Sequence, residues 1–156
     1  MSLKAKRIVS RLRRLGACEA GTQLAELAIV LPLLLVLFGA TAEFGRFFYT
    51  YATLAKATRA AARYLTASNR ASDADAQHLV VYGTTDDGAT EPVLSGLSTT
   101  NVDITREGPA GFPETVKVAI SGYKYQPIFD LGKLMGNGFT MSVDVKPSTT
   151  MRYVNN

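Results

Sequence analysis

The stretch GTQLAELAIVLPLLLVLFGATAEF, residues 21–44, contains an apolar run that approaches the width of a membrane. No charged side chain occurs within residues 27–42. As a helix this run reaches about 24 Å, at about 1.5 Å per residue. Helical extension into its flanks would cover a hydrocarbon core of about 30 Å. A single carboxylate, Glu26, immediately precedes the run. Because a carboxylate near hydrocarbon is energetically costly, Glu26 is a candidate functional residue.

Positive charge is concentrated in front of this run. Residues 1–21 carry six Lys or Arg side chains against the single carboxylate of Glu19, a net charge of +5. The remaining residues carry 11 basic and 12 acidic side chains. The positive-inside rule therefore predicts a cytoplasmic N-terminus, and the chain after about residue 48 would face the other side of the membrane. No basic face interleaved with aromatic side chains follows residues 1–21. The chain's net charge of +4 therefore does not indicate nucleic-acid binding.

Two alternative interpretations of the N-terminal region are disfavoured. A cleaved secretory signal would end at a small-residue site such as residues 39–42, but the helical pattern continues well beyond that site. A lipoprotein signal would place its apolar region before Cys18, whereas the region before Cys18 is basic here. Since Cys18 is the single cysteine of the sequence, no internal disulfide is possible, and we interpret it as an incidental thiol.

The apolar run continues into an amphipathic segment. Its apolar side chains recur every three or four residues, the spacing of one helical face. We therefore predict one long helix over residues 22–67, with a transmembrane half at about residues 24–48. The predicted apolar face consists of Phe44, Phe47, Tyr51, Leu54, Thr58, Ala61 and Leu65.

Other side chains of this helix have separate interpretations. Lys56, Arg59 and Arg63 share a face that we interpret as solvated. Pro32 lacks an N–H, so it would bend or locally melt the helix, although prolines are also common in membrane helices. The side chains that suit the interfacial zone of the membrane are Phe47, Phe48, Tyr49 and Tyr51.

Residues 68–156 are predicted to form an extracytoplasmic α+β domain. Ser72 and the acidic Asp75 are typical of a helix start, and Gly83 is typical of a helix end. A loop-like segment follows at residues 83–100. Period-two alternation then predicts one-sided antiparallel strands, whose apolar face the long helix would cover. The predicted strands are residues 101–106, 115–121, 139–146 and 149–154, with Val143 and Val145 among the inward positions. A helical turn beginning at Pro127 and a turn at residues 136–138 are predicted between the later strands.

The sequence contains no constellation that would carry catalysis. His78 is the only histidine, and no matched nucleophile or acid–base partner accompanies it. Asp86 and Asp87 lie in a Gly- and Thr-rich segment that lacks the regular alternation of an EF-hand loop, so a plain turn is expected there. The sequence has neither a phosphate-cradling loop nor a Cys/His metal cluster. We therefore expect a protein that is not an enzyme and that uses no cofactor or metal.

The basic leader, Gly21, Glu26 and the immediate apolar helix together resemble a class III signal of the type IV pilin superfamily. In that class a prepilin peptidase cuts after a glycine on the cytoplasmic side, and the fifth residue of the mature chain is glutamate. The resemblance implies cleavage after Gly21. Thr22 would then be the new N-terminus, Glu26 the fifth residue, and residues 1–21 the removed leader.

Three joined motifs also resemble the TadE-like family of tight-adherence (Flp) pilus systems. In that family "E-A-LVLP", "EFGR-F" and "A-R-AARY" recur in this order, and they match residues 26–32, 43–47 and 57–64. The resemblance implies a pilin-like fold, in which a long N-terminal helix packs on a small antiparallel sheet. It also implies a minor pilin or pseudopilin of the bacterial inner membrane that enters the pilus after processing. A permanently anchored bitopic scaffold that never enters the filament is the alternative.

The resemblance further implies a set of partners. These are the prepilin peptidase, other pilins or pseudopilins, the inner-membrane platform proteins of the pilus, and membrane lipid. Geometry adds a specific role for Glu26. After cleavage Thr22 has a free ammonium, and residues four apart share a helix face, so the two charges can pair within the chain. In an assembled bundle, Glu26 could instead reach the ammonium of a neighbouring subunit. Low dielectric makes an unpaired carboxylate costly and a pair more favourable than in water.

Overall fold

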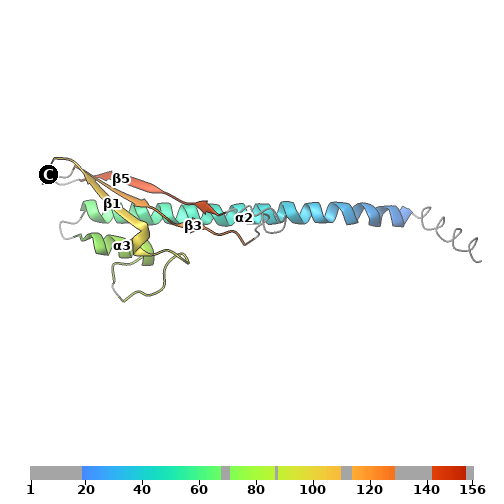
Figure 1. Ribbon diagram of the computed structural model, residues 1–156, viewed down its shortest axis with the longest axis horizontal. Coiled ribbons are helices and arrows are strands. Elements are labelled where there is room, and N and C mark those ends of the chain that lie inside the picture. Colours follow the sequence, from blue (N-terminus) through green and yellow to red (C-terminus); the bar gives the residue numbers. More distant parts are fainter. Residues whose placement is uncertain (1–18, 68–70, 87, 110–113, 129–141, 154–156) are drawn as a thin grey trace, which may run out of the picture. The chain divides into compact units, whose positions relative to one another are not determined.

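The computed structural model describes residues 19–67, 71–86, 88–109, 114–128 and 142–153. Its helices are α2 (Glu19–Ala67), α3 (Asp73–Tyr82) and the 3₁₀ helix η1 (Thr99–Asn101). Its strands are β1 (Val102–Glu107), β2 (Thr115–Ile120), β3 (Lys124–Tyr125), β4 (Val143–Asp144) and β5 (Ser148–Arg152) (Figure 1). One long N-terminal helix combined with a small antiparallel sheet is the predicted α+β fold. The chain divides into two compact units, Met1–Ala42 and Glu43–Asn156, and the boundary falls within α2.

The N-terminal half of α2 exposes its apolar side chains over residues 21–42. Leucine, isoleucine, valine and phenylalanine side chains are exposed all around this half, for example at Leu24, Ile29 and Phe38. α2 is long and apolar enough to cross a membrane, by its length and composition. The helix is present from Glu19, the first described residue, and it continues through Pro32. So large an apolar surface is unfavourable in water and indicates contact with lipid or with other helices.

The C-terminal half of α2, residues 43–67, forms one wall of the core of the second unit. Leu54, Thr58 and Ala61 have no exposed surface, and Leu65 has almost none. The predicted face is wrong at Phe44 and Tyr51, whose side chains are 65% and 47% exposed. The buried stripe instead follows positions 47, 50, 54, 58, 61 and 65, which average the 3.6 residues of a helical turn. Thr50 therefore takes the inward place that the sequence analysis gave to Tyr51.

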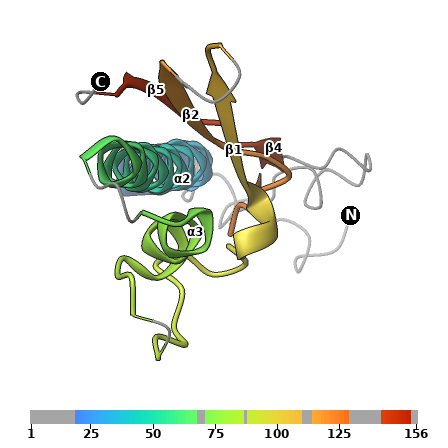
Figure 2. The ribbon, with the colours of Figure 1, turned by 90° about the vertical axis from the view of Figure 1, so that its left-hand side faces the viewer.

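A three-stranded antiparallel sheet covers this stripe. Its strand order is β1-β2-β5, with Ile104 paired to Val118 and Val118 paired to Thr149. The predicted alternation of β2 is confirmed, because Val116, Val118 and Ile120 are buried. The sheet and α3 lie on different sides of α2 in the view along the helix (Figure 2). Core side chains thus come from both helices and from the sheet.

The prediction of one continuous sheet is wrong. β3, which was not predicted, pairs with β4 in a separate two-stranded ribbon. Within the described residues, the predicted strand 139–146 is reduced to β4. Val143 was expected to point inward, yet it is 48% exposed, whereas its partner Tyr125 is buried. Val145, also predicted inward, is buried. The helical turn after Pro127 and the turn at residues 136–138 lie outside the described residues.

α3 begins and ends as the sequence predicts. The Ser72 side chain accepts a hydrogen bond from the Asp75 backbone N–H at 3.0 Å, which caps the helix N-terminus. Gly83 ends the helix in the left-handed conformation, at φ 75°, where a side chain would be strained. The Gly83 N–H donates to the Leu79 carbonyl at 3.0 Å. These two ends hold Ala76, Val80 and Val81 in the core.

Candidate processing and assembly site

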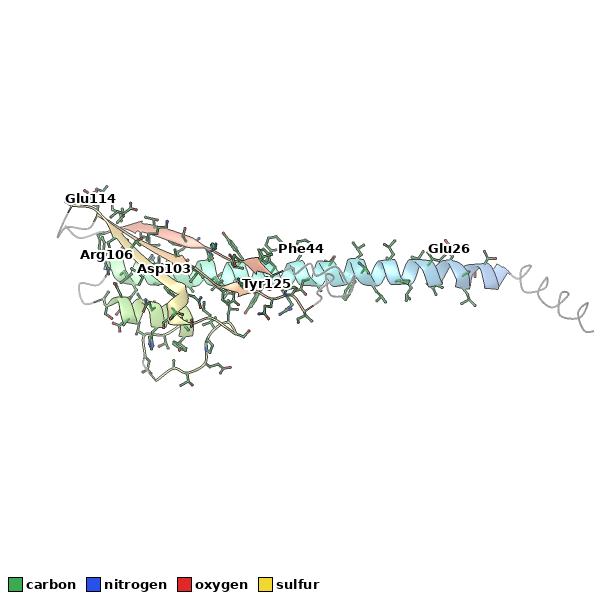
Figure 3. The ribbon with its side chains drawn as sticks, in the orientation of Figure 1. Glu26, Phe44, Asp103, Arg106, Glu114 and Tyr125 are labelled. Atoms are coloured by element: carbon green, nitrogen blue, oxygen red, sulfur yellow. The ribbon has the colours of Figure 1, made fainter. Side chains whose placement is uncertain are left out.

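The residues predicted for processing lie at the beginning of α2. Gly21, Thr22 and Glu26 are exposed there (Figure 3 labels Glu26). Gly21 lies within the described part of α2, close to its first described residue. Thr22 and Glu26 are four residues apart in a continuous helix and therefore share a face. Cleavage after Gly21 and a bend at Pro32 stay predictions.

A second cluster surrounds Glu43, the first charged residue after the apolar run. The Tyr125 hydroxyl, from β3, donates a hydrogen bond to Glu43 Oε1. The backbone N–H of Ile128 donates to the same oxygen at 3.3 Å. The Glu43 side chain is 16% exposed. The Glu43 carboxylate therefore anchors β3 and the residues that follow it to α2. Phe44 and Tyr125 lie in the same region of the second unit (Figure 3).

Arg46 and Phe47 complete this Glu43 cluster. Arg46 Nη1 lies 3.5 Å from Glu43 Oε1, and its guanidinium carbon lies 5.9 Å from the centre of the Tyr125 ring. The Phe47 ring meets the Tyr125 ring edge-to-face, with centres 5.4 Å apart. The stacked cation and the aromatic pair add attraction beyond the apolar area that they bury. Three of the four charged and aromatic positions of the EFGRF motif, Glu43, Arg46 and Phe47, thus contact Tyr125.

The environment of Tyr125 also changes its acidity. Burial, followed by the hydrogen bond to the Glu43 carboxylate, raises the pKa of the Tyr125 phenol to about 12. Ionisation would remove the donated proton and place two negative charges side by side. Tyr125 therefore acts as a hydrogen-bond donor at neutral pH.

The later motif makes an equivalent contact with α3. The Tyr64 hydroxyl donates to Asp75 Oδ2 at 3.1 Å, which joins the C-terminal end of α2 to the first turn of α3. Partial burial and this hydrogen bond raise the pKa of the Tyr64 phenol. Arg63 of the same motif points to solvent, as Lys56 and Arg59 do. The predicted solvated face is therefore confirmed.

A third polar contact joins β1 to α3. Arg106 Nη1 donates to Asp73 Oδ2 at 2.9 Å, and its second terminal nitrogen contacts the other carboxylate oxygen. Arg106 Nε donates to the Tyr153 hydroxyl at 3.1 Å. The hydrogen bond from Arg106 lowers the pKa of Asp73 below its usual value. Figure 3 shows Arg106 on β1, in the second unit and apart from Tyr125.

The other residues considered for chemistry have structural places. His78 is half-buried on α3, with its ring 5.2 Å from the centre of the Tyr82 ring. Asp86 Oδ1 accepts from the Gly88 N–H at 3.1 Å, which confirms a turn at this position. Asp87 and Cys18 lie outside the described residues. Among the residues that the structure does describe, no group of His, Cys, Asp and Glu could hold a metal ion.

The contact of Tyr125 with Glu43 was not predicted from the sequence. The signal on the α2 side was visible, because Glu43 is a carboxylate at the end of an uncharged run and belongs to a recognisable motif. No local pattern links it to a tyrosine 82 positions later. Only the folded ribbon brings these two side chains together.

Among the described residues, the fold combines one helix that is long and apolar enough to cross a membrane with a small α+β domain, which indicates a single-pass membrane protein. Comparison with known proteins adds the family. The family model described as TadE-like protein matches residues 21–63, fewer than a third of the chain. The matched segment contains Glu26, the EFGRF motif and most of the AARY motif, so residues 21–63 are TadE-like, as the motifs indicate. The TadE-like family implies a structural role in Tad pilus assembly. No curated protein and no solved structure matches the chain.

Proposed function

We propose that this protein is a minor pilin or pseudopilin of a tight-adherence pilus, made as an inner-membrane precursor and cut by a prepilin peptidase after Gly21. The leader would be cytoplasmic and residues after the span extracytoplasmic. The other partners would be pilins or pseudopilins and the platform proteins of the inner membrane. The processed chain would then leave the membrane as part of the filament.

The supporting observation is the continuity of α2. The processing residues, the apolar run and the wall of the folded domain lie on one uninterrupted helix, Glu19–Ala67. A subunit of this kind can enter a bundle of apolar helices while its domain remains folded outside. The exposed apolar side chains of residues 21–42 supply the surface that such a bundle requires. The match to a TadE-like model over residues 21–63 supports the same function.

Glu26 has a defined part in this proposal. Cleavage would create the Thr22 ammonium one helical turn away, on the face that carries Glu26. The carboxylate would then pair with that ammonium or with the ammonium of a neighbouring subunit. A charge pair in low dielectric fixes the register of two apolar helices, because sliding would leave both charges unpaired.

The decisive experiment for processing is the mass of the full-length protein from cells with and without the peptidase. We expect loss of residues 1–21 only when the peptidase is present, and no loss in a Gly21→Ala variant. Gly45→Ala is the matched control, because a Cβ at Gly45 meets nothing within 4 Å, so this variant should be cut normally. An uncut wild-type chain in cells that have the peptidase would refute the processing proposal.

A Glu26→Ala variant tests assembly separately from cleavage. The span becomes more apolar, so we expect normal membrane insertion. Loss of the charge pair should reduce pili per cell by on the order of tenfold or more, since each 1.4 kcal/mol of lost interaction is a factor of ten. Membrane fractionation and electron microscopy measure the two quantities. Glu91→Ala removes an exposed carboxylate from a loop of the second unit and should leave pilus number unchanged.

The alternative of a permanently anchored scaffold makes a different prediction. A scaffold would stay in the membrane fraction when pili are sheared from the cells and purified. A filament subunit would be present in purified pili, at the mass of the processed chain. Its absence from pili that assemble normally would favour the scaffold.

A further inference from the structure

Three apolar side chains beside the Glu43 cluster are exposed. They are Phe44 on α2, Ile128 after β3 and Val143 on β4, and we call them the apolar edge. Ile128 is 67% exposed although its own N–H bonds to the Glu43 carboxylate. Val143 pairs with Tyr125, whose hydroxyl bonds to that same carboxylate. Two segments distant in sequence therefore hold exposed apolar side chains close to one residue of α2.

The position of Glu43 along α2 sets the height of the apolar edge relative to the membrane. Residues 22–42 of a helix extend about 31 Å at about 1.5 Å per residue. This length equals the hydrocarbon core of a typical bilayer, about 30 Å. Because Glu43 is the first charged residue after the uncharged run, its charge favours a span over residues 22–42 in place of the predicted span at about residues 24–48. Glu43 then lies at the boundary of a membrane that α2 crosses. Any group that is hydrogen-bonded to the Glu43 carboxylate therefore lies close to the membrane boundary, within about the length of one side chain.

The surroundings of the apolar edge suit lipid headgroups. Phe48 and Tyr49 are exposed one turn further along α2, and aromatic side chains favour the membrane interface. Arg46 is half-exposed, and Lys124 beside Tyr125 is exposed. Basic side chains at this level attract anionic headgroups. An apolar edge with flanking aromatic and basic groups is the chemistry of an interfacial lipid contact.

We propose that the β3–β4 ribbon rests on the membrane that α2 crosses, with Ile128 and Val143 inserted at the boundary between headgroups and acyl chains. The second unit would then contact lipid at the ribbon as well as at α2. This inference rests on the membrane span of the proposed function, but not on cleavage after Gly21 or on entry into a pilus.

The experiment uses the full-length chain with Cys18→Ser, reconstituted into vesicles of phosphatidylcholine and phosphatidylglycerol. A nitroxide label is attached at a single cysteine, in Ile128→Cys or Val143→Cys, and its collisions with oxygen and with a water-soluble nickel chelate are measured. Oxygen concentrates in lipid and the nickel chelate in water. Two reference positions are Leu35→Cys, in the span, and Glu114→Cys, at the end of the second unit opposite to Tyr125 (Figure 3).

We expect an oxygen-to-nickel ratio at positions 128 and 143 that is several-fold higher than at 114 and lower than at 35. Ratios at 128 and 143 equal to that at 114, with a lipid value at 35, would overturn the lipid contact alone. A water value at position 35 would overturn the membrane span itself. Protection at 128 that disappears on dilution with lipid would show a contact between copies of the chain, and would also overturn the proposal.

Discussion

The two halves of α2 have similar helical backbones and opposite surroundings. Residues 21–42 expose leucine, isoleucine and phenylalanine on every side, whereas residues 43–67 bury one stripe against a sheet and a second helix. The buried half contains threonine and alanine where it meets the sheet, and the exposed half contains mostly large aliphatic side chains. Apolar character alone therefore does not identify a core helix. The spacing of small and large side chains around the helix distinguishes a face that packs within one chain from a surface that meets lipid.

Replacing one leucine in each half of α2 should give the largest difference in stability between the two halves. Leu54→Ala removes a fully buried side chain and should destabilise the second unit by about 2–5 kcal/mol. Leu35→Ala removes an exposed side chain from the other half and should change the stability of that unit by less than about 0.5 kcal/mol. Urea unfolding in detergent, followed by tyrosine near-ultraviolet circular dichroism, measures both. Equal effects would mean that the halves do not differ in packing.

A Tyr125→Phe variant tests the hydrogen bond between the C-terminal half of α2 and the β3–β4 ribbon. It leaves the Glu43 carboxylate without its phenol donor and should cost about 1.5–2 kcal/mol at neutral pH, as expected for a hydrogen bond to a charged group. Because folding raises the pKa of Tyr125 from 10.0 to about 12, its contribution is complete below pH 10 and is lost as the pH rises through 12. The free energy of unfolding of the variant should therefore fall less than that of the wild type as the pH rises from 10 to about 12.

Tyr49→Phe is the control for this pH dependence. Tyr49 is exposed, so its variant should keep the stability of the wild type at neutral pH and the same decline at alkaline pH. Unfolding free energies measured between pH 7 and about pH 12 separate the two variants. An unchanged alkaline decline in Tyr125→Phe would contradict the assigned hydrogen bond.

The smallest expected difference comes from two threonines of α2. The Thr58 hydroxyl lies 3.2 Å from the Thr149 hydroxyl and joins the buried half to β5. Thr58→Val should cost about 1 kcal/mol, since it leaves Thr149 without this partner. The Thr41 hydroxyl donates only to the Leu37 carbonyl of its own helix, at 2.9 Å, so Thr41→Val should be nearly neutral. A double variant at 58 and 149 that costs the sum of the single variants would exclude coupling between them.

The long helix, the caps of α3 and the strands β1, β2 and β5 could be predicted because each depends on local spacing. The helix pattern lasts for many turns. The Ser72 hydroxyl can cap a helix N-terminus, and Gly83 has no Cβ that would be strained in the left-handed conformation at a helix end. The stripe was misplaced at Tyr51 because the neighbouring sheet, which the periodicity does not contain, selects the side chains that become buried. The ribbon was missed for the same reason, since a two-residue strand such as β3 has no period to detect.

The candidate site shows the same division. Gly21, Thr22 and Glu26 could be identified because their relation is one of position along a helix. Glu43 and Tyr125 could not be paired, because their contact depends on how the ribbon folds over α2. The motif around Glu43 indicated that these residues matter, but it did not indicate which side chain they contact.

The use of α2 as a wall of the core limits how the second unit can be released from a membrane. A protease that cuts between Leu54 and Leu65 would remove part of the hydrophobic core, so the released fragment would unfold. A cut just before Glu43 would retain the core and the hydrogen bonds of Tyr125 and Ile128. Release of a folded second unit that keeps these hydrogen bonds therefore requires cleavage at or before the end of the apolar run, which a membrane crossed by α2 would shield from proteases in water.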